Sequence, residues 1–234
     1  MFAPVIDERS LLRHPFNPTA PEISANVPLL IGTTAEETRS IMGGADQTLF
    51  SLDEAELRAR LQKLGLEANQ LESLIDAYRV TRPQASPSDI FFAITGDLTE
   101  RYPAIVKAER KAMLAAAPAY MYLFTWEIPA FGGKYGAAHG MELPYMFDNI
   151  DAAPGVWGGD PHPQRYLLSE NVSRAWVAFA RTGNPSHSGL PEWKSYTANS
   201  RATMLLNYTC ELVNDPKAED RLAMQRLEAQ SAWN

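Results

Sequence analysis

Short apolar runs that predict strands alternate along this chain with segments of helical spacing. Residues 27–34, VPLLIGTT, are an apolar run closed by glycine and threonines, which predicts a strand buried on both faces of a sheet. The run AYMYLFTW at residues 119–126 predicts a second core strand. Two shorter strands are predicted near residues 203–206 and 210–213. Strands separated by helices indicate an α/β fold with a mostly parallel sheet.

Helical patterns fill most of the chain between the two core strands. A first helix can begin within AEETRSIM, directly after the first strand. Ser51 and Glu54 have the spacing of a capping box, so a second helix is expected to start there. Apolar residues then recur at helical spacing, as Leu57, Leu61, Leu64, Leu71, Leu74, Ile75 and Tyr78. Further helices are expected from 86 to Ile94 or beyond and from about 103 to 116. Residues 51–116 are therefore predicted to be a large helical insertion between core strands.

The remaining segments fit the same architecture. Residues 1–26 are rich in proline and polar groups and predict an extended surface segment. A glycine-rich loop at 129–138 follows the second core strand. Residues 167–181 place apolar side chains on one helical face and stop before Gly183, as a C-capped helix does. A last helix is expected from about Pro216.

Composition narrows the class of protein. The chain has 234 residues, 45% of them apolar and 21% charged, which suits a single unit spanning residues 1–234. The net charge is −7 and the 21 lysines and arginines are scattered, so no nucleic-acid partner is expected. With no apolar segment long enough to span a bilayer and no secretory signal, we expect a cytoplasmic protein without a membrane partner. The single cysteine, Cys210, excludes an internal disulfide and a cysteine-rich metal site. No cofactor or metal is expected.

Four histidines are candidates for chemistry. His14, His162 and His187 lie in polar or proline-rich segments and are expected to be surface loop residues. His139 follows a core strand and a glycine-rich loop, a setting near the end of a sheet where binding crevices form. From the residues alone, His139 is either a catalytic group or a partly buried structural histidine.

Two acidic residues follow the first core strand directly. Glu36 and Glu37 can simply stabilise the positive end of the helix dipole in the first turn. Alternatively, one of them is a carboxylate that reaches an imidazole placed after the next strand. The chain order, acid and then histidine, matches the last two members of an α/β-hydrolase triad.

Two stretches resemble type-B carboxylesterases. The segment IGTTAEE, from Ile31 to Glu37, is similar to the family's strand end and triad glutamate, which implies that Glu37 is the triad acid. The segment AAHGMELPYMF, from Ala137 to Phe147, is similar to the family's histidine segment and implies that His139 is the triad base. The later segment WVAFARTGNP, with Trp193 and Tyr196, also resembles the family, so the resemblance extends over essentially the whole chain.

The resemblance implies the C-terminal part of an α/β-hydrolase domain and a function in ester hydrolysis. In this family a Ser-His-Glu triad cleaves small-molecule carboxylic esters, and Glu37 and His139 would be the acid and the histidine. Glu142 is expected to be structural. Phe131 and Trp126 either pack in the core and loop or help to wall a substrate pocket.

The sequence departs from the family in two places. Thr38 and Arg39 stand where the family follows its glutamate with glycine, so Glu36 is kept as the reserve for the triad acid. No G-x-S-x-G occurs in the 234 residues, and the glycine-rich oxyanion segment is absent too. In the family both lie N-terminal to the region matched here. We therefore interpret the chain as a C-terminal fragment, a split-gene product or a shortened form, with the nucleophile elbow absent.

Different functions follow from this interpretation. A carboxylesterase whose serine comes from a separate N-terminal half would be inactive as the isolated chain. That chain would also tend to self-associate, because the strand at 27–34 would be left as a sheet edge. The alternatives are a non-catalytic esterase-like binding protein and an inactive gene fragment. Retention of both Glu37 and His139 favours the enzyme, since a binding protein has no chemical reason to keep them.

Overall fold

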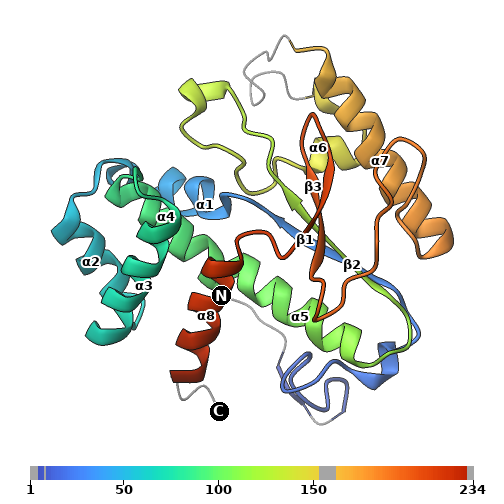
Figure 1. Cartoon of the computed structure of the whole chain (residues 1–234), viewed down its shortest axis with the longest axis horizontal. Helices are drawn as coiled ribbons and strands as arrows, with labels where there is room; N and C mark the ends of the chain where they lie inside the picture. The colour runs from blue at the N-terminus through green and yellow to red at the C-terminus, as the bar shows by residue number, and fades with distance from the viewer. Residues whose placement is uncertain (1–4, 8, 153–161, 231–234) are drawn as a thin grey trace.

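Four strands form one sheet in the part of the chain that the computed structural model describes, residues 5–7, 9–152 and 162–230. In order across the sheet they are β1 (Leu29–Thr34), β2 (Ala119–Phe124), β3 (Ala202–Leu206) and β4 (Glu211–Asn214) (Figure 1). β1, β2 and β3 are parallel, and β4 is antiparallel to β3. The predicted α/β fold with a mostly parallel sheet is confirmed.

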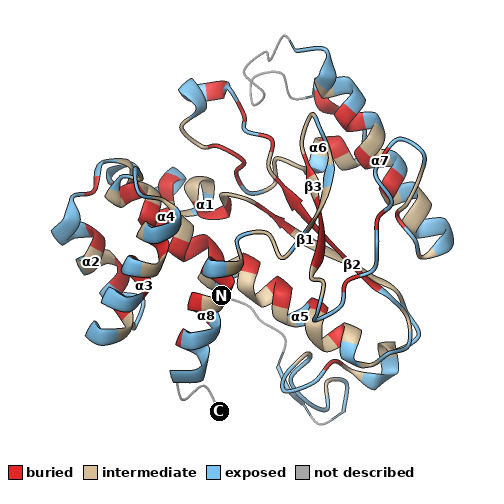
Figure 2. Ribbon diagram, viewed as in Figure 1, coloured by how far each residue is buried: buried red, intermediate tan, exposed pale blue. Residues whose placement is uncertain are grey.

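β2 is covered on both of its faces, and all of its residues are buried. Successive side chains of a strand point to opposite faces. Tyr120, Tyr122 and Phe124 lie on one face, and Ala119 and Met121 on the other. The first set packs with residues of α7 (Gln164–Thr182), and the second with residues of α5 (Tyr102–Met113). Figure 2 shows the buried residues along the strands and on the helix sides that face them.

β1 lies at one edge of the described sheet, with β2 as its described neighbour. Its first four residues are only half-buried, whereas Thr33 and Thr34 are buried. The prediction of a strand buried on both faces was therefore wrong for residues 29–32. The physical reason is that an edge strand has packing neighbours along one side only. The strand also begins at Leu29, two residues later than predicted.

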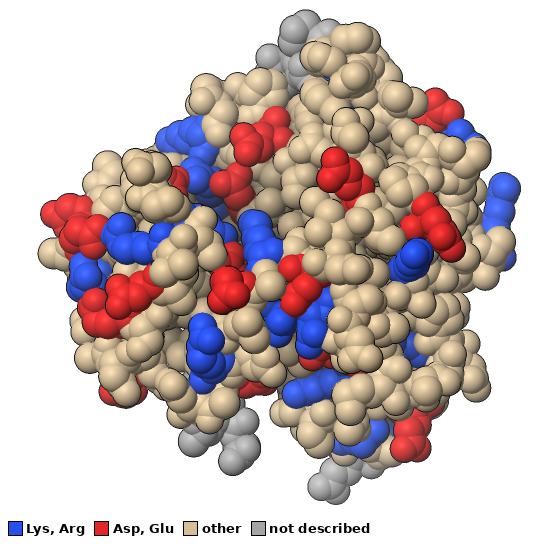
Figure 3. All heavy atoms as spheres, viewed as in Figure 1, with Lys and Arg blue, Asp and Glu red and all other residues tan. Residues whose placement is uncertain are grey.

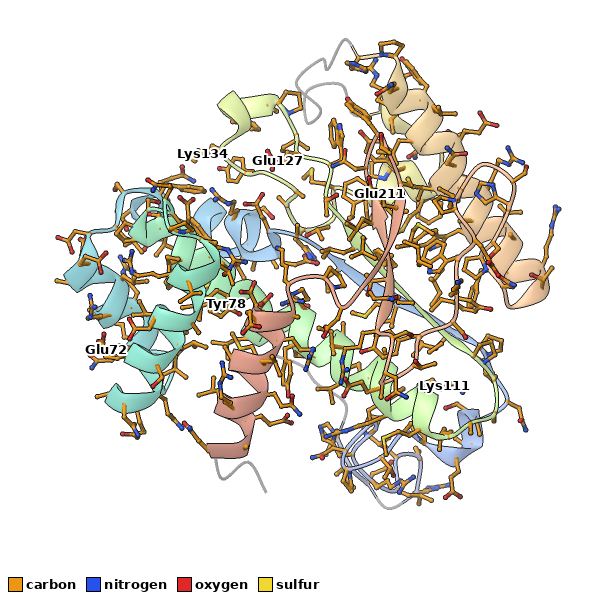
Figure 4. The ribbon with its side chains drawn as sticks, in the orientation of Figure 1. Glu72, Tyr78, Lys111, Glu127, Lys134 and Glu211 are labelled. Carbon is orange, nitrogen blue, oxygen red and sulfur yellow. The ribbon has the colours of Figure 1, made fainter. Side chains whose placement is uncertain are left out.

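The chain between β1 and β2 is helical, as predicted. Its α-helices are α1 (Glu37–Ala45), α2 (Glu54–Gln62), α3 (Ala68–Thr81), α4 (Pro87–Gly96) and α5. Residues of α2, α3 and α4 share a second apolar core with α8 (Ala218–Gln230), and these helices lie together on the left of Figure 1. Tyr78, labelled in Figure 4, is fully buried in this second core.

The start of α2 differs from the predicted one. The N-cap is Asp53, whose carboxylate accepts a hydrogen bond from the Glu56 backbone N–H (2.8 Å), while the Glu56 carboxylate accepts from the Asp53 N–H (3.0 Å). Ser51 instead ends the 3-10 helix η2 (Gln47–Ser51). Aspartate caps helices as well as serine does. The capping box of Asp53 and Glu56, two residues after the predicted one of Ser51 and Glu54, therefore sets the start of α2. α2 ends at Gln62, which leaves Leu64 outside it.

α4 and α5 form one continuous helical run rather than two separate helices. A five-residue π turn, η3 (Asp97–Arg101), joins them, so the helix from 86 extends beyond Ile94, as the sequence allowed, and runs into the next helix without a break. Proline inside an α-helix removes a hydrogen bond and crowds the carbonyl four residues earlier. Pro103 avoids this cost, because it lies in the first turn of α5, directly after the wider π turn.

The boundaries after β2 also shift by a few residues. β2 ends at Phe124, α7 begins at Gln164 rather than 167, and α8 begins at Ala218 rather than 216. Gly183 ends α7 in the left-handed conformation, with φ 74°. Besides η2, four short helices among the described residues were not predicted: η1 (Glu22–Ser24), η4 (Ala130–Gly133), α6 (Leu143–Met146) and η5 (Ile150–Ala152).

Two surface properties of the described residues bear on partners. No helix among them has the length and apolar character needed to cross a membrane. On the face shown in Figure 3, lysines and arginines are interspersed with acidic residues and form no continuous basic stripe.

Close packing of β1 on β2 can be tested at Gly32. A Cβ atom at Gly32 would lie 2.3 Å from the Tyr122 carbonyl oxygen and 2.4 Å from its Cγ, so Gly32→Ala must push the strands apart. We expect the free energy of unfolding to fall by about 1–3 kcal/mol. Gly44→Ala is the control, because nothing lies within 4 Å of its added methyl and alanine favours helix α1 by about 0.5–1 kcal/mol. Urea unfolding should give the two variants effects of opposite sign.

Candidate active site

The parallel pairing of β1 and β2 brings two functional segments to one edge of the sheet. Thr34 pairs with Phe124, so both strands end at the same level. The Ala35 N–H donates to the Phe124 carbonyl (2.9 Å), which continues the pairing one residue further. α1 begins directly after β1, and the loop that carries His139 follows β2.

Glu37 and His139 meet at this edge. His139 Nδ1 lies 2.6 Å from Glu37 Oε2, which is a hydrogen-bond distance. An ionised carboxylate can only accept hydrogen bonds, so Nδ1–H donates and the neutral imidazole keeps its lone pair on Nε2. The Glu37 side chain is 7% exposed and the His139 side chain 57% exposed. A buried acid therefore orients an accessible imidazole.

Glu37 is itself held from the opposite side. Its Oε1 accepts a hydrogen bond from the Thr34 backbone N–H (2.7 Å), the last residue of β1. It is also the first residue of α1, where the positive end of the helix dipole favours a negative charge. Glu37 therefore does both of the things that the sequence left open: it stabilises the positive end of the helix dipole and it binds the imidazole of His139.

Glu36, the reserve for the acid, has other partners. Its Oε2 accepts a hydrogen bond from the Ala137 N–H (3.0 Å), and its Oε1 forms an ion pair with Arg39 Nε (2.9 Å). No hydrogen bond joins Glu36 to His139 among the described residues. Glu36 is half-buried against the loop.

The other three histidines lie in loops, as expected. His14 is exposed, with Nδ1 3.0 Å from the Pro15 carbonyl. His162 is exposed and stacks on Tyr208 with ring centroids 4.9 Å apart. His187 is half-buried and bonds through Nε2 to the Asn171 carbonyl (2.9 Å). Within the described part of the chain, no hydrogen bond or ring contact joins any of these three histidines to Glu37 or His139.

Two further carboxyl groups interact electrostatically with the pair. Burial, and then the negative charge of Glu37, raise the pKa of Glu100. Burial also raises the pKa of Glu142, with Glu37 acting in the same direction and His139 against it. Glu142 Oε2 is buried without a hydrogen-bond partner among the described residues. Sequence analysis missed Glu100, because the π turn that carries it has no recognised sequence signature.

The two aromatic candidates differ in their surroundings. Trp126 is 3% exposed and packs with Tyr145 at a ring separation of 5.3 Å, so it belongs to the core. Phe131 is 70% exposed and makes an edge contact with Tyr135 at 5.5 Å. Phe131 therefore lies on the surface of the glycine-rich loop rather than in the core.

The arrangement can accept a proton but holds no hydrogen-bonded nucleophile in the described part of the chain. Nε2 of an imidazole oriented through Nδ1 is the atom that acts as general base in a serine-hydrolase triad. Among the described residues, no group of three or more His, Cys, Asp or Glu side chains has the arrangement of a metal site. Acid–base chemistry at His139 is what the geometry supports.

Comparisons with known proteins point to one family. The family model described as the carboxylesterase family matches residues 1–227. The para-nitrobenzyl esterase of Bacillus subtilis (strain 168) is 31% identical over 220 residues, which are 94% of this chain and 42% of the relative. The phenmedipham hydrolase of Pseudarthrobacter oxydans is 27% identical over 97% of this chain and 44% of that protein.

A solved structure gives the same result for the fold. The carboxylesterase EST55 of Geobacillus stearothermophilus superposes with a TM-score of 0.80 at 30% identity, over 95% of this chain and 45% of that one. The chain thus spans less than half the length of each of these relatives.

The buried position of Glu142 predicts a pH-dependent gain in stability when its charge is removed. Because the pKa of Glu142 is higher in the folded chain than its usual 4.5, the folded state holds more protons at mildly acidic pH. Its contribution to stability is present below pH 4.5 and is lost as the pH rises through the folded pKa. Glu142→Gln should therefore unfold at a higher urea concentration than the parent at pH 8, and should differ little from the parent at pH 4.

The matched control is Glu211→Gln, on the exposed end of β4 and labelled in Figure 4. Its difference from the parent should not vary in this way with pH. A Glu142→Gln gain that is equal at both pH values would contradict the assignment of the effect to burial of this carboxylate.

Proposed function

The chain belongs to the carboxylesterase family, and we propose that it supplies the acid and the base of a Ser-His-Glu hydrolase that cleaves carboxylic esters. The single observation that supports this most is the 2.6 Å hydrogen bond between Glu37 and His139. The substrate proposed is a small-molecule carboxylic ester, in keeping with esterases among the relatives.

The proposed reaction has two halves that use the same imidazole. A serine outside these 234 residues attacks the ester carbonyl carbon while its hydroxyl proton passes to His139 Nε2. When the tetrahedral intermediate collapses, His139 returns that proton to the oxygen of the leaving alcohol. Water then attacks the acyl-serine by the same route and releases the carboxylic acid.

Glu37 has a supporting role in this proposal. Its buried carboxylate holds the imidazole in the tautomer that presents Nε2, and it stabilises the positive charge that His139 gains on protonation. Backbone N–H groups outside this chain would stabilise the oxyanion. The half-buried edge strand β1 is where the remainder of the sheet would pair, either on the same polypeptide or on a separate N-terminal half.

The catalytic roles can be tested once the serine-bearing segment is present. We expect the coding sequence directly upstream to contain a G-x-S-x-G segment, and the chain supplied with that segment to hydrolyse p-nitrophenyl esters. His139→Ala should then lower kcat by about 10⁶-fold, and Glu37→Gln by about 10⁴-fold, because the acid only orients the base. The control is His14→Ala, which changes an exposed histidine that does not contact Glu37 or His139 in the described structure, and it should leave kcat unchanged. Full activity of His139→Ala would contradict the proposed mechanism.

The isolated chain should behave differently from the complete enzyme. Without an activated serine and oxyanion donors, a His–Glu pair gives only weak help to water, so we expect no ester hydrolysis above background. We also expect self-association, since the outer edge of β1 offers unpaired backbone groups to another chain. Light scattering and an activated-ester assay test the two expectations. A monomer that turns over substrate and reacts with a serine-directed phosphonate would show that a nucleophile lies within these residues.

A further inference from the structure

The loop that carries His139 needs to be held in place. The His139 side chain is 57% exposed, and within the described residues its imidazole forms a hydrogen bond with Glu37. Before it, Phe131, Gly132, Gly133 and Gly136 all have positive φ angles between 56° and 77°. Phe131, Gly132 and Gly133 are exposed, whereas Ala137 and Ala138 are buried directly before His139, so the position of the imidazole depends on what holds this buried stretch of backbone in place.

Glu36 fastens the loop two residues before His139. The Glu36 N–H donates to the Ala137 carbonyl, and the Ala137 N–H donates to Glu36 Oε2, both at 3.0 Å. A Cβ atom at Gly136 would lie 1.6 Å from Glu36 Oε2, so only glycine lets the carboxylate come this close. The two hydrogen bonds join the end of β1 to the loop by a short, paired contact.

Arg39 holds this contact together. Its Nε forms an ion pair with Glu36 Oε1 (2.9 Å), and its Nη1 donates to the Lys134 carbonyl (3.1 Å). Its Nη2 forms an ion pair with Asp89 Oδ1 (2.6 Å), in the first turn of α4. The Arg39 side chain is 17% exposed, so these charge-assisted contacts are partly shielded from water.

The same loop is also anchored to the helices beyond α1. The Lys134 ammonium lies 4.3 Å from the centroid of the Phe50 ring. Figure 4 shows Lys134 at the end of the loop nearest the group of helices. Arg39 therefore lies at the centre of a set of contacts between α1, α4 and the histidine loop.

We propose that Arg39 is a positioning residue: by pairing with Glu36 and donating to the Lys134 carbonyl, it holds the loop so that His139 stays within hydrogen-bond distance of Glu37. Arg39 is one of the two residues, Thr38 and Arg39, that stand where the resembled family follows its glutamate with glycine. The contribution of this positioning to catalysis rests on the proposed ester hydrolysis. The positioning itself does not depend on that activity.

The test uses the 234-residue chain and the His139 Nδ1 proton, observed by ¹H–¹⁵N NMR. The signal is assigned by its loss in His139→Gln. Arg39→Met keeps the length of the side chain but removes all three polar contacts, and we expect exchange of the Nδ1 proton with water to become about tenfold faster or more. Arg39→Lys keeps the charge but loses the planar fork, so it should lie between the parent and Arg39→Met.

The matched control is Arg58→Met. Arg58 also bridges two carboxylates, Glu54 and Glu72, but on the exposed surface of the helical insertion. Its loss should leave the His139 signal unchanged. Circular dichroism should first show that both variants are folded. If the His139 Nδ1 proton then exchanges with water at the same rate in Arg39→Met and Arg58→Met, the proposal is overturned, even if Arg39→Met is the less stable of the two.

Two further outcomes are decisive. If Arg39→Met does not fold, Arg39→Lys decides, because a folded Arg39→Lys chain with parental exchange would also overturn the proposal. If the complete enzyme shows no esterase activity while Arg39→Met exchanges faster, the proposed function fails and the positioning role stands. With activity present, Arg39→Met should lower kcat more than it changes KM.

Discussion

The parallel pairing of β1 with β2 is the constraint on which the rest of the structure depends. It places the start of α1 beside the loop after β2, and so joins Glu37 to His139 across 102 positions of sequence. The pairing is close because Gly32 leaves room for the Tyr122 backbone and ring. A wider separation of the two strands would move the acid and the imidazole apart, since each is attached within a few residues to its strand or loop.

Around the imidazole, neighbouring carboxylates have different tasks. Glu37 uses one oxygen for Thr34 and the other for His139, whereas Glu36 binds the loop backbone and Arg39. The negative charge of Glu37 raises the pKa of Glu100 and of Glu142, whereas a charged His139 lowers both, so a protonated imidazole favours the ionised form of these two carboxyl groups. A general base acquires positive charge as it works, so this surrounding suits the role proposed for His139.

The geometry of the acid and the base is contained within a chain that spans less than half of its relatives. Three apolar cores, formed by residues of the sheet, the covering helices and the helical insertion, support the segments that carry Glu37 and His139. Both partners of the Glu37–His139 contact, and the Thr34 N–H that holds Glu37, lie within the described residues. The nucleophile and the oxyanion donors are, in our proposal, the parts that another segment adds.

The sequence by itself determined the elements whose signals are local. Apolar runs marked β1 and β2, Ser86 with Pro87 marked the start of α4, and Gly183 marked the end of α7, because each depends on neighbouring residues. The resemblance to carboxylesterases identified Glu37 and His139 as the candidate acid and base. Only the tertiary structure decided the π turn that brings Glu100 near the site, the partial burial of β1, and the partners of Glu36 and Arg39. These depend on contacts between residues about 50 to 100 positions apart, and a linear pattern of polar and apolar residues carries no information on which distant backbone groups will meet.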